Sequence, residues 1–305
     1  MKQGKVKPIH LKATMTVGAA FALIMGNCAD HLAVSAKCAS QSPNPQTVHQ
    51  LRVAIRRLRA AVSDFRRTAQ YKHRPVVLTK LRALQQRLGG AREWDVLIDE
   101  TIGSTPRRLR GRGLRQVVEA AELQRTQGYD RARAALEDRG YTDLLPRVLL
   151  WKKRNLKLNT HHPANGIQSG ALYRPVGEFA AELVRERRKK AKKLGKKIRK
   201  LDLKQLHRLR IRVKKLRYTV EFFGDVLPGL RTERYLSALK KLQQVLGTAH
   251  DTIVAVDLVT TLEKSEGKSV EPAASMIRNW ALECHKRDRK KLVALWRRLE
   301  KHDFN

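Results

Sequence analysis

Two short segments of the chain each carry a histidine followed by regularly spaced cations. The first comprises His49, Arg52, Arg56 and Arg59, and the second comprises His207, Arg210, Lys214 and Arg217. A planar guanidinium holds two phosphate oxygens at once, and an ammonium group adds a less directional charge. Residues of these types therefore predict the binding of a phosphate-bearing polyanion, and we assign none of them a catalytic role.

Each series lies on one face of an expected helix. At about 100° per residue the cations of the first segment share a face with His49, while Leu51, Leu58 and Phe65 fall on the opposite face. Solvated helix faces usually mix signs, because like charges four residues apart cost about 0.2–0.5 kcal/mol per pair. A row of cations about 15 Å long on each of two helices therefore favours an anionic ligand over plain solvent exposure.

Four further cations are weaker candidates for the same site. Arg57 and Lys215 lie at one flank of the two cationic faces. Lys189 and Lys193 belong to the basic run 185–200, "RERRKKAKKLGKKIRK". This run serves either as a wall of the site or as a general electrostatic surface, and the sequence favours neither.

The two segments belong to an internal repeat, because His207 follows His49 by 158 positions and the same offset relates "LQQRLGGA" to "LQQVLGTA". Proline- and glycine-rich breaks divide each copy into about four helical segments, and no stretch alternates as a strand does. We therefore predict an all-α fold, a tandem duplication of a four-helix bundle with a basic channel between the two halves. The expected first half is 1–159, the linker 160–170 and the second half 171–305.

The composition points to the same class of partner. With 65 Lys and Arg against 28 Asp and Glu, the net charge of +37 opposes folding unless an anion relieves the repulsion. Aromatic residues make up 5% of the chain, and those near the cationic rows lie toward the apolar faces. Single-stranded nucleic-acid binders interleave aromatic side chains for base stacking, so nucleic acid is the less favoured polyanion.

The three cysteines form no motif, and we expect them to be reduced thiols in a cytoplasmic protein. The apolar run 13–26 is shorter than the roughly 20 residues of a membrane span. Its counterpart in the second copy begins near residue 171, where no signal peptide can lie. We therefore expect a core helix there and no insertion into a membrane.

At these residues the chain resembles the CHAD domain family, named for conserved histidines in an α-helical domain. The family pattern of His, then Arg three residues later, then a basic pair and Arg occurs in both segments, and "LQQRLGGAREWD" and "LQQVLGTAHD" resemble its third helix. The resemblance spans 13–300 and implies two four-helix bundles facing each other across a basic channel. It also implies binding of inorganic polyphosphate and association with polyphosphate granules. Asp95 and Asp251 differ in position between the copies, so neither receives a role.

Two other functions remain open at this point. The same charge could bind nucleic acid or an acidic protein, and a histidine on a helical bundle could carry a transferable phosphate. Gly267, Lys268 and Ser269 resemble the end of a phosphate-binding loop, but Leu262 stands where that loop needs glycine. No carboxylate cluster accompanies the two histidines to hold a metal ion for phosphoryl transfer. We therefore expect a non-enzymatic protein without cofactor or metal.

Overall fold

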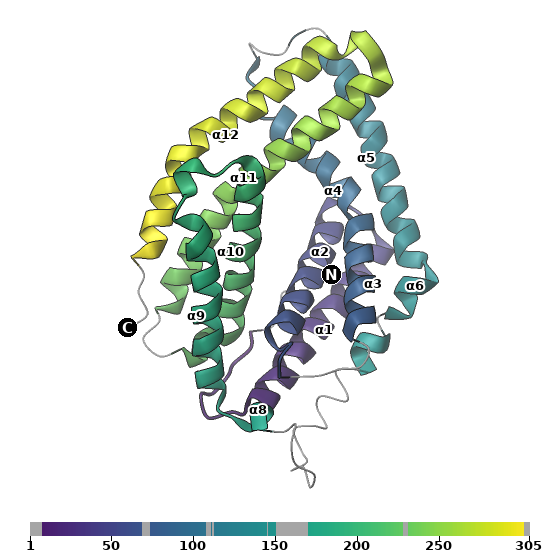
Figure 1. Ribbon diagram of the computed structural model, residues 1–305. Coiled ribbons are helices and arrows are strands. Elements are labelled where there is room, and N and C mark those ends of the chain that lie inside the picture. Colours follow the sequence, from purple (N-terminus) through teal and green to yellow (C-terminus); the bar gives the residue numbers. More distant parts are fainter. Residues whose placement is uncertain are drawn as a thin grey trace.

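The computed structural model describes residues 8–68, 74–107, 111, 113–144, 146–150, 170–227 and 231–301. Its regular elements are helices, which confirms the expected all-α class. Those of the first half are α1 (Val17–Gln41), α2 (Pro45–Asp64), α3 (Arg74–Arg87), α4 (Gly89–Asp95), the π-helix η1 (Val96–Ile102), α5 (Leu114–Glu137) and α6 (Arg139–Thr142). Those of the second half are α8 (Gly170–Tyr173), α9 (Val176–Gly195), η3 (Ile198–Lys200), α10 (Leu203–Phe223), η4 (Gly224–Val226), α11 (Thr232–Glu266), η5 (Gly267–Ser269) and α12 (Glu271–Glu300). Figure 1 shows the two halves side by side.

Capping boxes fix the first turns of the two helices that carry the cationic rows. At the start of α2 the Asn44 side chain accepts hydrogen bonds from the backbone N–H groups of Gln46 and Thr47, and Thr47 Oγ1 accepts from the Asn44 N–H. At the start of α10 Asp202 and Gln205 exchange the equivalent pair of bonds. Such reciprocal bonds satisfy backbone donors that a helix start leaves unpaired. The start of each cationic helix is therefore set locally by its own sequence.

The sequence predicts breaks at 42–45, 103–106, 200–202 and 267–272, and each coincides with a helix end: Pro45 begins α2, Lys200 ends η3, and 267–272 contains the short η5 and the start of α12. The further breaks predicted at 72–75 and 227–229 lie partly outside the described residues. One interruption was not expected. The segment "LQQRLGGAREWD" is divided at Leu88 between α3 and α4, whereas "LQQVLGTAHD" lies within the uninterrupted α11. The first copy has two successive glycines where the second has Gly247 and Thr248, and each glycine lowers helix propensity by about 1 kcal/mol relative to alanine. Of the expected linker, the structure describes only Gly170, which begins α8.

The two halves share their hydrophobic core. Phe21 and Phe65 of the first half meet Phe179 and Phe223 of the second, with ring centroids 4.7–5.9 Å apart in the contacting pairs. The two pairs are related by the repeat offset, so equivalent positions of the two copies build this contact. A second apolar cluster around Trp94 joins η1 and α5 to α11 and α12, at the top of Figure 1. The halves are therefore packed together both through the shared core and through this second cluster.

Two stretches, α1 and Thr232–Ser269, are long and apolar enough to cross a membrane by length and composition. Core helices of globular proteins pass the same test. In α1, 61% of the most apolar window is buried inside the structure. Ile24, Met25 and Cys28 of this helix are fully buried in the shared core. The N-terminal apolar run thus packs as the core helix that the repeat predicted.

Candidate functional site

A cavity of about 780 Å³ lies between the two halves. Its walls come from α2, α3, α4 and η1 on one side and from α10 and α11 on the other. Three histidines and ten Lys and Arg side chains face three carboxylates in the lining, and the Lys and Arg are Arg52, Arg56, Arg59, Arg66, Arg74, Arg82, Arg92, Arg210, Lys214 and Lys215. So many like charges around one space repel each other until an anion enters.

Seven of the eight residues that the sequence singled out line this cavity, namely His49, Arg52, Arg56, Arg59, His207, Arg210 and Lys214. The eighth, Arg217, is held elsewhere. Its Nη1 lies 3.3 Å from Glu221 Oε1, and its guanidinium stacks over the ring of Tyr218 at 4.8 Å from the centroid. The first copy has Ser63 where the second has Glu221, so Arg59 lacks this competing partner and reaches the cavity.

The four weaker candidates are divided between three places. Lys215 lines the cavity, as expected. Arg57, its equivalent in the first copy, is buried and stacks over the ring of Phe222, 5.4 Å from the centroid. Lys189 and Lys193 are exposed on α9, and no described residue of that helix lines the cavity. The structure therefore brings only one of the four to the predicted site.

The two cationic rows lie close enough to perturb each other across the cavity. Burial lowers the pKa of Lys214 to about 7, and the charges of Arg210 and Arg56 contribute to this. Burial, followed by the charge of Arg56, lowers the pKa of Arg52 to about 10. The buried Nε atoms of Arg56 and Arg210 have no hydrogen-bond partner among the described residues. An anion between the rows would supply both the missing acceptors and the opposing charge.

Residues of α3 and α4 hold the arginines of the first row in place. Arg52 Nη1 donates to the backbone oxygen of Gln85 at 3.0 Å, and Arg59 Nη1 donates to Gln85 Oε1 at 2.6 Å. Gly89 lies directly behind Arg52, because a Cβ added there would be 3.2 Å from Arg52 Nη1. Gly247 occupies the equivalent place in the second copy, where a Cβ would be 3.9 Å from Arg210 Nη2. The repeated "LG" of the sequence thus leaves room for an arginine in each half.

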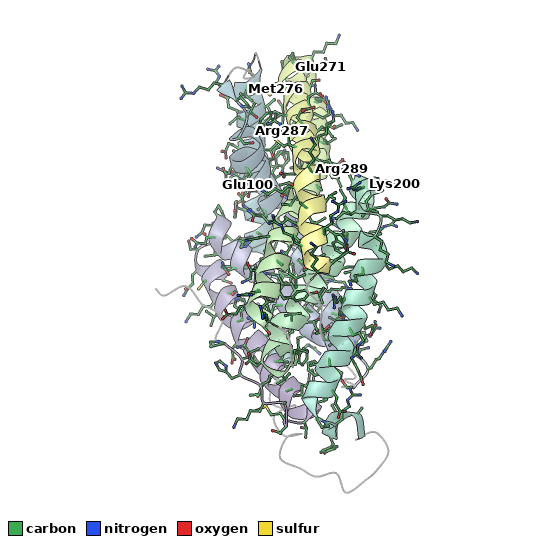
Figure 2. All side chains as sticks on the ribbon, turned by 90° about the vertical axis from the view of Figure 1, so that its left-hand side faces the viewer. Glu100, Lys200, Glu271, Met276, Arg287 and Arg289 are labelled. Atoms are coloured by element: carbon green, nitrogen blue, oxygen red, sulfur yellow. The ribbon has the colours of Figure 1, made fainter. Side chains whose placement is uncertain are left out.

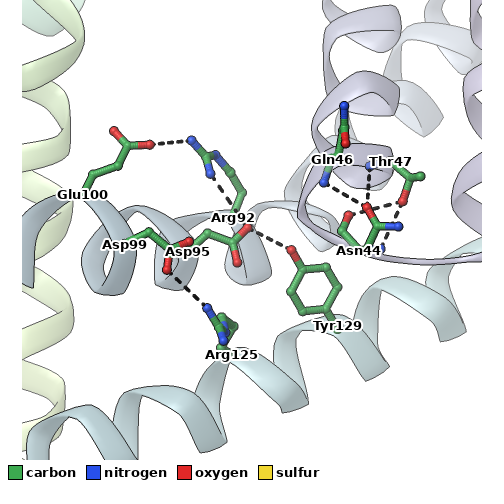
Figure 3. A network of polar contacts seen from close by, with 9 residues as sticks. All are labelled: Asn44, Gln46, Thr47, Arg92, Asp95, Asp99, Glu100, Arg125 and Tyr129. Atoms are coloured by element: carbon green, nitrogen blue, oxygen red, sulfur yellow. Dashed lines mark hydrogen bonds and ion pairs between the residues drawn. The ribbon is translucent and has the colours of Figure 1, made fainter. Parts of the chain in front are cut away.

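Arg92 is a cavity residue that the sequence did not single out, and a polar network fixes it (Figure 3). Arg92 Nη2 donates to Glu100 Oε1 at 2.7 Å, and Arg92 Nη1 lies 3.9 Å from Asp95 Oδ2. Asp95 is fully buried, accepts a 2.8 Å hydrogen bond from the Tyr129 hydroxyl, and has its pKa raised by burial. Asp95 therefore anchors α4 to α5 and stays outside the cavity lining.

The repeat offset places His250 where the first half has Arg92. Nδ1 of His250 lies 3.2 Å from Nδ1 of His207, so one nitrogen donates and the other accepts. Burial, and then the charge of Arg210, lowers the pKa of His250 to about 4 and also lowers that of His207. Burial likewise lowers the pKa of His49. The histidines of the cavity are therefore mainly neutral at neutral pH until an anion favours their protonation.

A buried ion pair ties the two halves together beside the cavity. Asp64 at the end of α2 accepts a 2.7 Å hydrogen bond from Arg187 of α9 and a 2.8 Å bond from Thr219 Oγ1 of α10. Arg187 also donates to Ser63 Oγ, which lines the cavity, at 3.1 Å. Burial raises the pKa of Asp64 to about 6. Within the described part of the chain, no three His, Cys, Asp or Glu side chains are grouped to hold a metal ion.

Two uncharacterized proteins of Mycobacterium tuberculosis are 29% identical to this chain over 213 residues, which cover 68% of it. The matched part spans 39% of the length of these relatives. PptA from Streptomyces chartreusis shares the fold, with a TM-score of 0.68 at 12% identity over 92% of this chain and 99% of that chain.

The crystal structure of the CHAD domain from the plant Ricinus communis is more similar in sequence to this chain than PptA is. It superposes with a TM-score of 0.80 at 26% identity, covering 96% of each chain. The family model of the CHAD domain matches residues 23–260, and this span includes both cationic helices and the full set of cavity-lining residues. The chain belongs to the CHAD domain family.

Proposed function

We propose that this protein binds inorganic polyphosphate in the cavity between its two halves and does not turn it over. The family is linked to polyphosphate binding in general. For this chain, one observation carries the proposal: ten Lys and Arg side chains, drawn from both halves, line a single cavity with three carboxylates. A linear polyanion lying between the rows would contact cations on two sides, which a single helix face cannot offer.

The lining favours an anion without bases. Apart from the histidines, Tyr218 is the one aromatic residue among the described lining residues, and it is 4% exposed with Arg217 stacked on it. Bases of a single-stranded nucleic acid would therefore find no free ring to stack on. A chain of phosphates needs only charge and hydrogen-bond donors, which the arginines supply.

The surroundings of the histidines favour binding over phosphoryl transfer. The residues that perturb His49 and His207 most strongly, after burial, are Arg56 and Arg210. A phosphoryl-transfer site would need a general base or a metal-holding pair of carboxylates beside the histidines, and Glu100 is already bound to Arg92.

By the same proposal the protein acts in the cytoplasm, on polyphosphate granules.

The discriminating experiment is a titration of labelled long-chain polyphosphate, duplex DNA and single-stranded DNA at matched charge concentration and physiological salt. Polyphosphate should bind more tightly than either DNA and should displace both. By analogy with nucleic acids, the logarithm of the affinity should fall with the logarithm of salt by about 0.7–0.9 per phosphate contact. Equal or tighter binding of DNA would overturn the proposal. Acid-labile phosphate on a histidine after incubation with polyphosphate would show a transfer enzyme instead.

A further inference from the structure

Helix α9 and the following turn carry a dense series of exposed cations, namely Lys189, Lys190, Lys193, Lys196, Lys197, Arg199 and Lys200. At the repeat offset the first copy has no charged residue at these places, but His31, Leu32, Ser35, Cys38, Ala39, Gln41 and Ser42. The first copy forms its helix α1 with this neutral set. Four of these, His31, Leu32, Ser35 and Ala39, are buried in α1, whereas the second copy exposes the equivalent positions. Exposure explains polar side chains on α9, but not side chains of a single sign, which call for another explanation.

The second half of α12 adjoins this series and adds to it. Arg289 donates hydrogen bonds to the backbone oxygens of Arg199 and Leu201 at 2.9 and 2.7 Å. The ring of Trp296 lies against Gly195, where an added Cβ would overlap it. The exposed cations of this half of α12 and its C-cap are Lys286, Arg287, Lys290, Lys291, Arg297, Arg298 and Lys301. Together the two series form a surface that we term the outer basic face, viewed in Figure 2, where Lys200 lies beside Arg289.

Few carboxylates neutralise the outer basic face. Glu186 pairs with Lys190 and Glu283 pairs with Lys286. No described carboxylate forms an ion pair with the other exposed cations of the face. Like charges at helical spacing cost about 0.2–0.5 kcal/mol per pair, so this face is destabilising unless a polyanion lies on it.

The chemistry of the face differs from that of the cavity. Lysines predominate on the face, whereas arginines predominate in the cavity. A lysine is a flexible point charge that suits loose, undirected contact with phosphates. Trp296, the tryptophan packed beneath the face, is buried, so it offers bases no surface for stacking. These features fit a mobile, base-free polyanion that is fixed in place somewhere else.

Helix α10 lies between the outer basic face and the cavity. It lines the cavity with Arg210 and Lys214, and its Arg212 donates to the backbone oxygen of Lys190 on α9. A helix with its side chains is about 10–12 Å across, so a polymer leaving the cavity has a short path to the face. A chain anchored in the cavity is present at high effective concentration beside that path.

Building on the polyphosphate-binding function above, we propose that the outer basic face holds a second stretch of the same polyphosphate chain. The cavity alone then binds short chains, and the cavity and the face together bind long ones. The protein is by this account selective for long polyphosphate, and the selectivity comes from the second half of the repeat.

The test compares tripolyphosphate with long-chain polyphosphate on three forms of the full chain. The face variant is Lys189→Gln, Lys193→Gln, Lys196→Gln and Lys197→Gln together. A matched control removes four exposed arginines of the first half, by Arg131→Gln, Arg133→Gln, Arg139→Gln and Arg147→Gln. Glutamine keeps good helix propensity, and circular dichroism verifies that all three forms are folded.

We expect the face variant to bind tripolyphosphate within about twofold of the unaltered protein and to lose about tenfold or more for long chains. The control should change both affinities by less than about threefold. Equal losses in the face variant and the control would overturn the inference. So would a face variant that loses binding to duplex DNA but keeps long-chain polyphosphate. Failure of the unaltered protein to bind either polyphosphate would instead remove the proposed function itself.

Discussion

The two halves of the molecule line one cavity with different kinds of charge. Every Lys or Arg that the first half contributes is an arginine, whereas the second half contributes Arg210, Lys214 and Lys215. Arg56 and Lys214 are equivalent positions of the repeat, as are Arg92 and His250. The first half therefore offers charge that is fixed at physiological pH. The second offers one group that titrates near neutral pH, since burial lowers the pKa of Lys214 to about 7, and one neutral imidazole, since burial lowers the pKa of His250 to about 4.

This difference suggests a division of labour between the halves. Three arginines of the first half are braced by residues of α3 and η1: Arg52 and Arg59 by Gln85, and Arg92 by Glu100. Lys214 has no such brace among the described residues and is perturbed mainly by burial and by Arg210 and Arg56. The charge of the first wall is thus permanent, whereas the charge of Lys214 in the second wall depends on whether an anion is present.

Removing charge from both walls should have the largest effect. Arg52, Arg56, Arg210 and Lys214 changed together to Gln should weaken polyphosphate binding about 100-fold or more, because each charge-assisted contact contributes about 1.5–3 kcal/mol. The unfolding free energy without ligand should not fall, because the change relieves repulsion. Titration and thermal unfolding check both points. The four-arginine control variant described above should bind nearly as the unaltered protein does, and an equal loss in it would argue for bulk charge alone.

Substitutions on the buried apolar faces of α2 and α10 should have the same effect in both halves, in contrast to substitutions in the cavity. Leu58 and Leu216 are equivalent and fully buried, so Leu58→Ala and Leu216→Ala should each lower the unfolding free energy by about 2–5 kcal/mol. Denaturant unfolding measures this loss. Polyphosphate affinity of the folded fraction should stay the same. A variant that stays fully folded but loses affinity for polyphosphate would mean that these apolar faces shape the site directly.

The pH dependence of polyphosphate binding should distinguish the contribution of the second half from that of the first. A bound phosphate favours protonated Lys214 and raises its pKa, so affinity is highest below pH 7 and falls as pH rises above it, by about tenfold from pH 6 to pH 8. Besides Arg210 and Arg56, the charges of Asp251 and Arg217 also act on the Lys214 ammonium. Lys214→Arg should flatten the profile. Arg56→Lys should steepen it, and titration at several pH values measures both. A profile unchanged in both variants would contradict the division of labour.

The smallest effect on polyphosphate binding is expected at the two glycines that lie behind Arg52 and Arg210. Gly89→Ala places a Cβ 3.2 Å from Arg52 Nη1 and should weaken polyphosphate binding by a few fold. Gly247→Ala meets nothing closer than 3.8 Å and lies within α11, so binding should be unchanged and stability should rise by about 0.5–1 kcal/mol. Titration and thermal unfolding of the two variants provide the comparison, and equal behaviour would show that Gly89 does not position Arg52.

The opposed faces of α2 and α10 could be predicted from the sequence because periodicity is a local property of one helix. Leu51, Leu58 and Phe65 are buried, while His49 and Arg52 line the cavity, as the spacing indicates. The repeat offset added the second row. The capping residues Asn44 and Asp202 are likewise local signals, and they lie in the predicted breaks before α2 and α10.

Which of the other cations reach the cavity depends on tertiary packing. Arg57 and Lys215 are equivalent in the repeat and share one helical angle, yet only Lys215 reaches the cavity, because Phe222 lies beneath Arg57. Arg92 and His250 come from other helices, where the sequence shows neither their orientation nor their neighbours. The usable signal was their matched position after the repeated "LG", which pairs an arginine with a histidine across the two copies.

The claim that both rows form one site is tested most directly by calorimetric titration with tripolyphosphate. The two forms to compare with the unaltered protein are Arg52→Gln with Arg56→Gln, and Arg210→Gln with Lys214→Gln. We predict one equivalent bound per chain in all three, with Kd weakened about tenfold or more in each variant. Two equivalents in the unaltered protein, with each variant losing one and keeping the Kd of the other, would contradict a shared site.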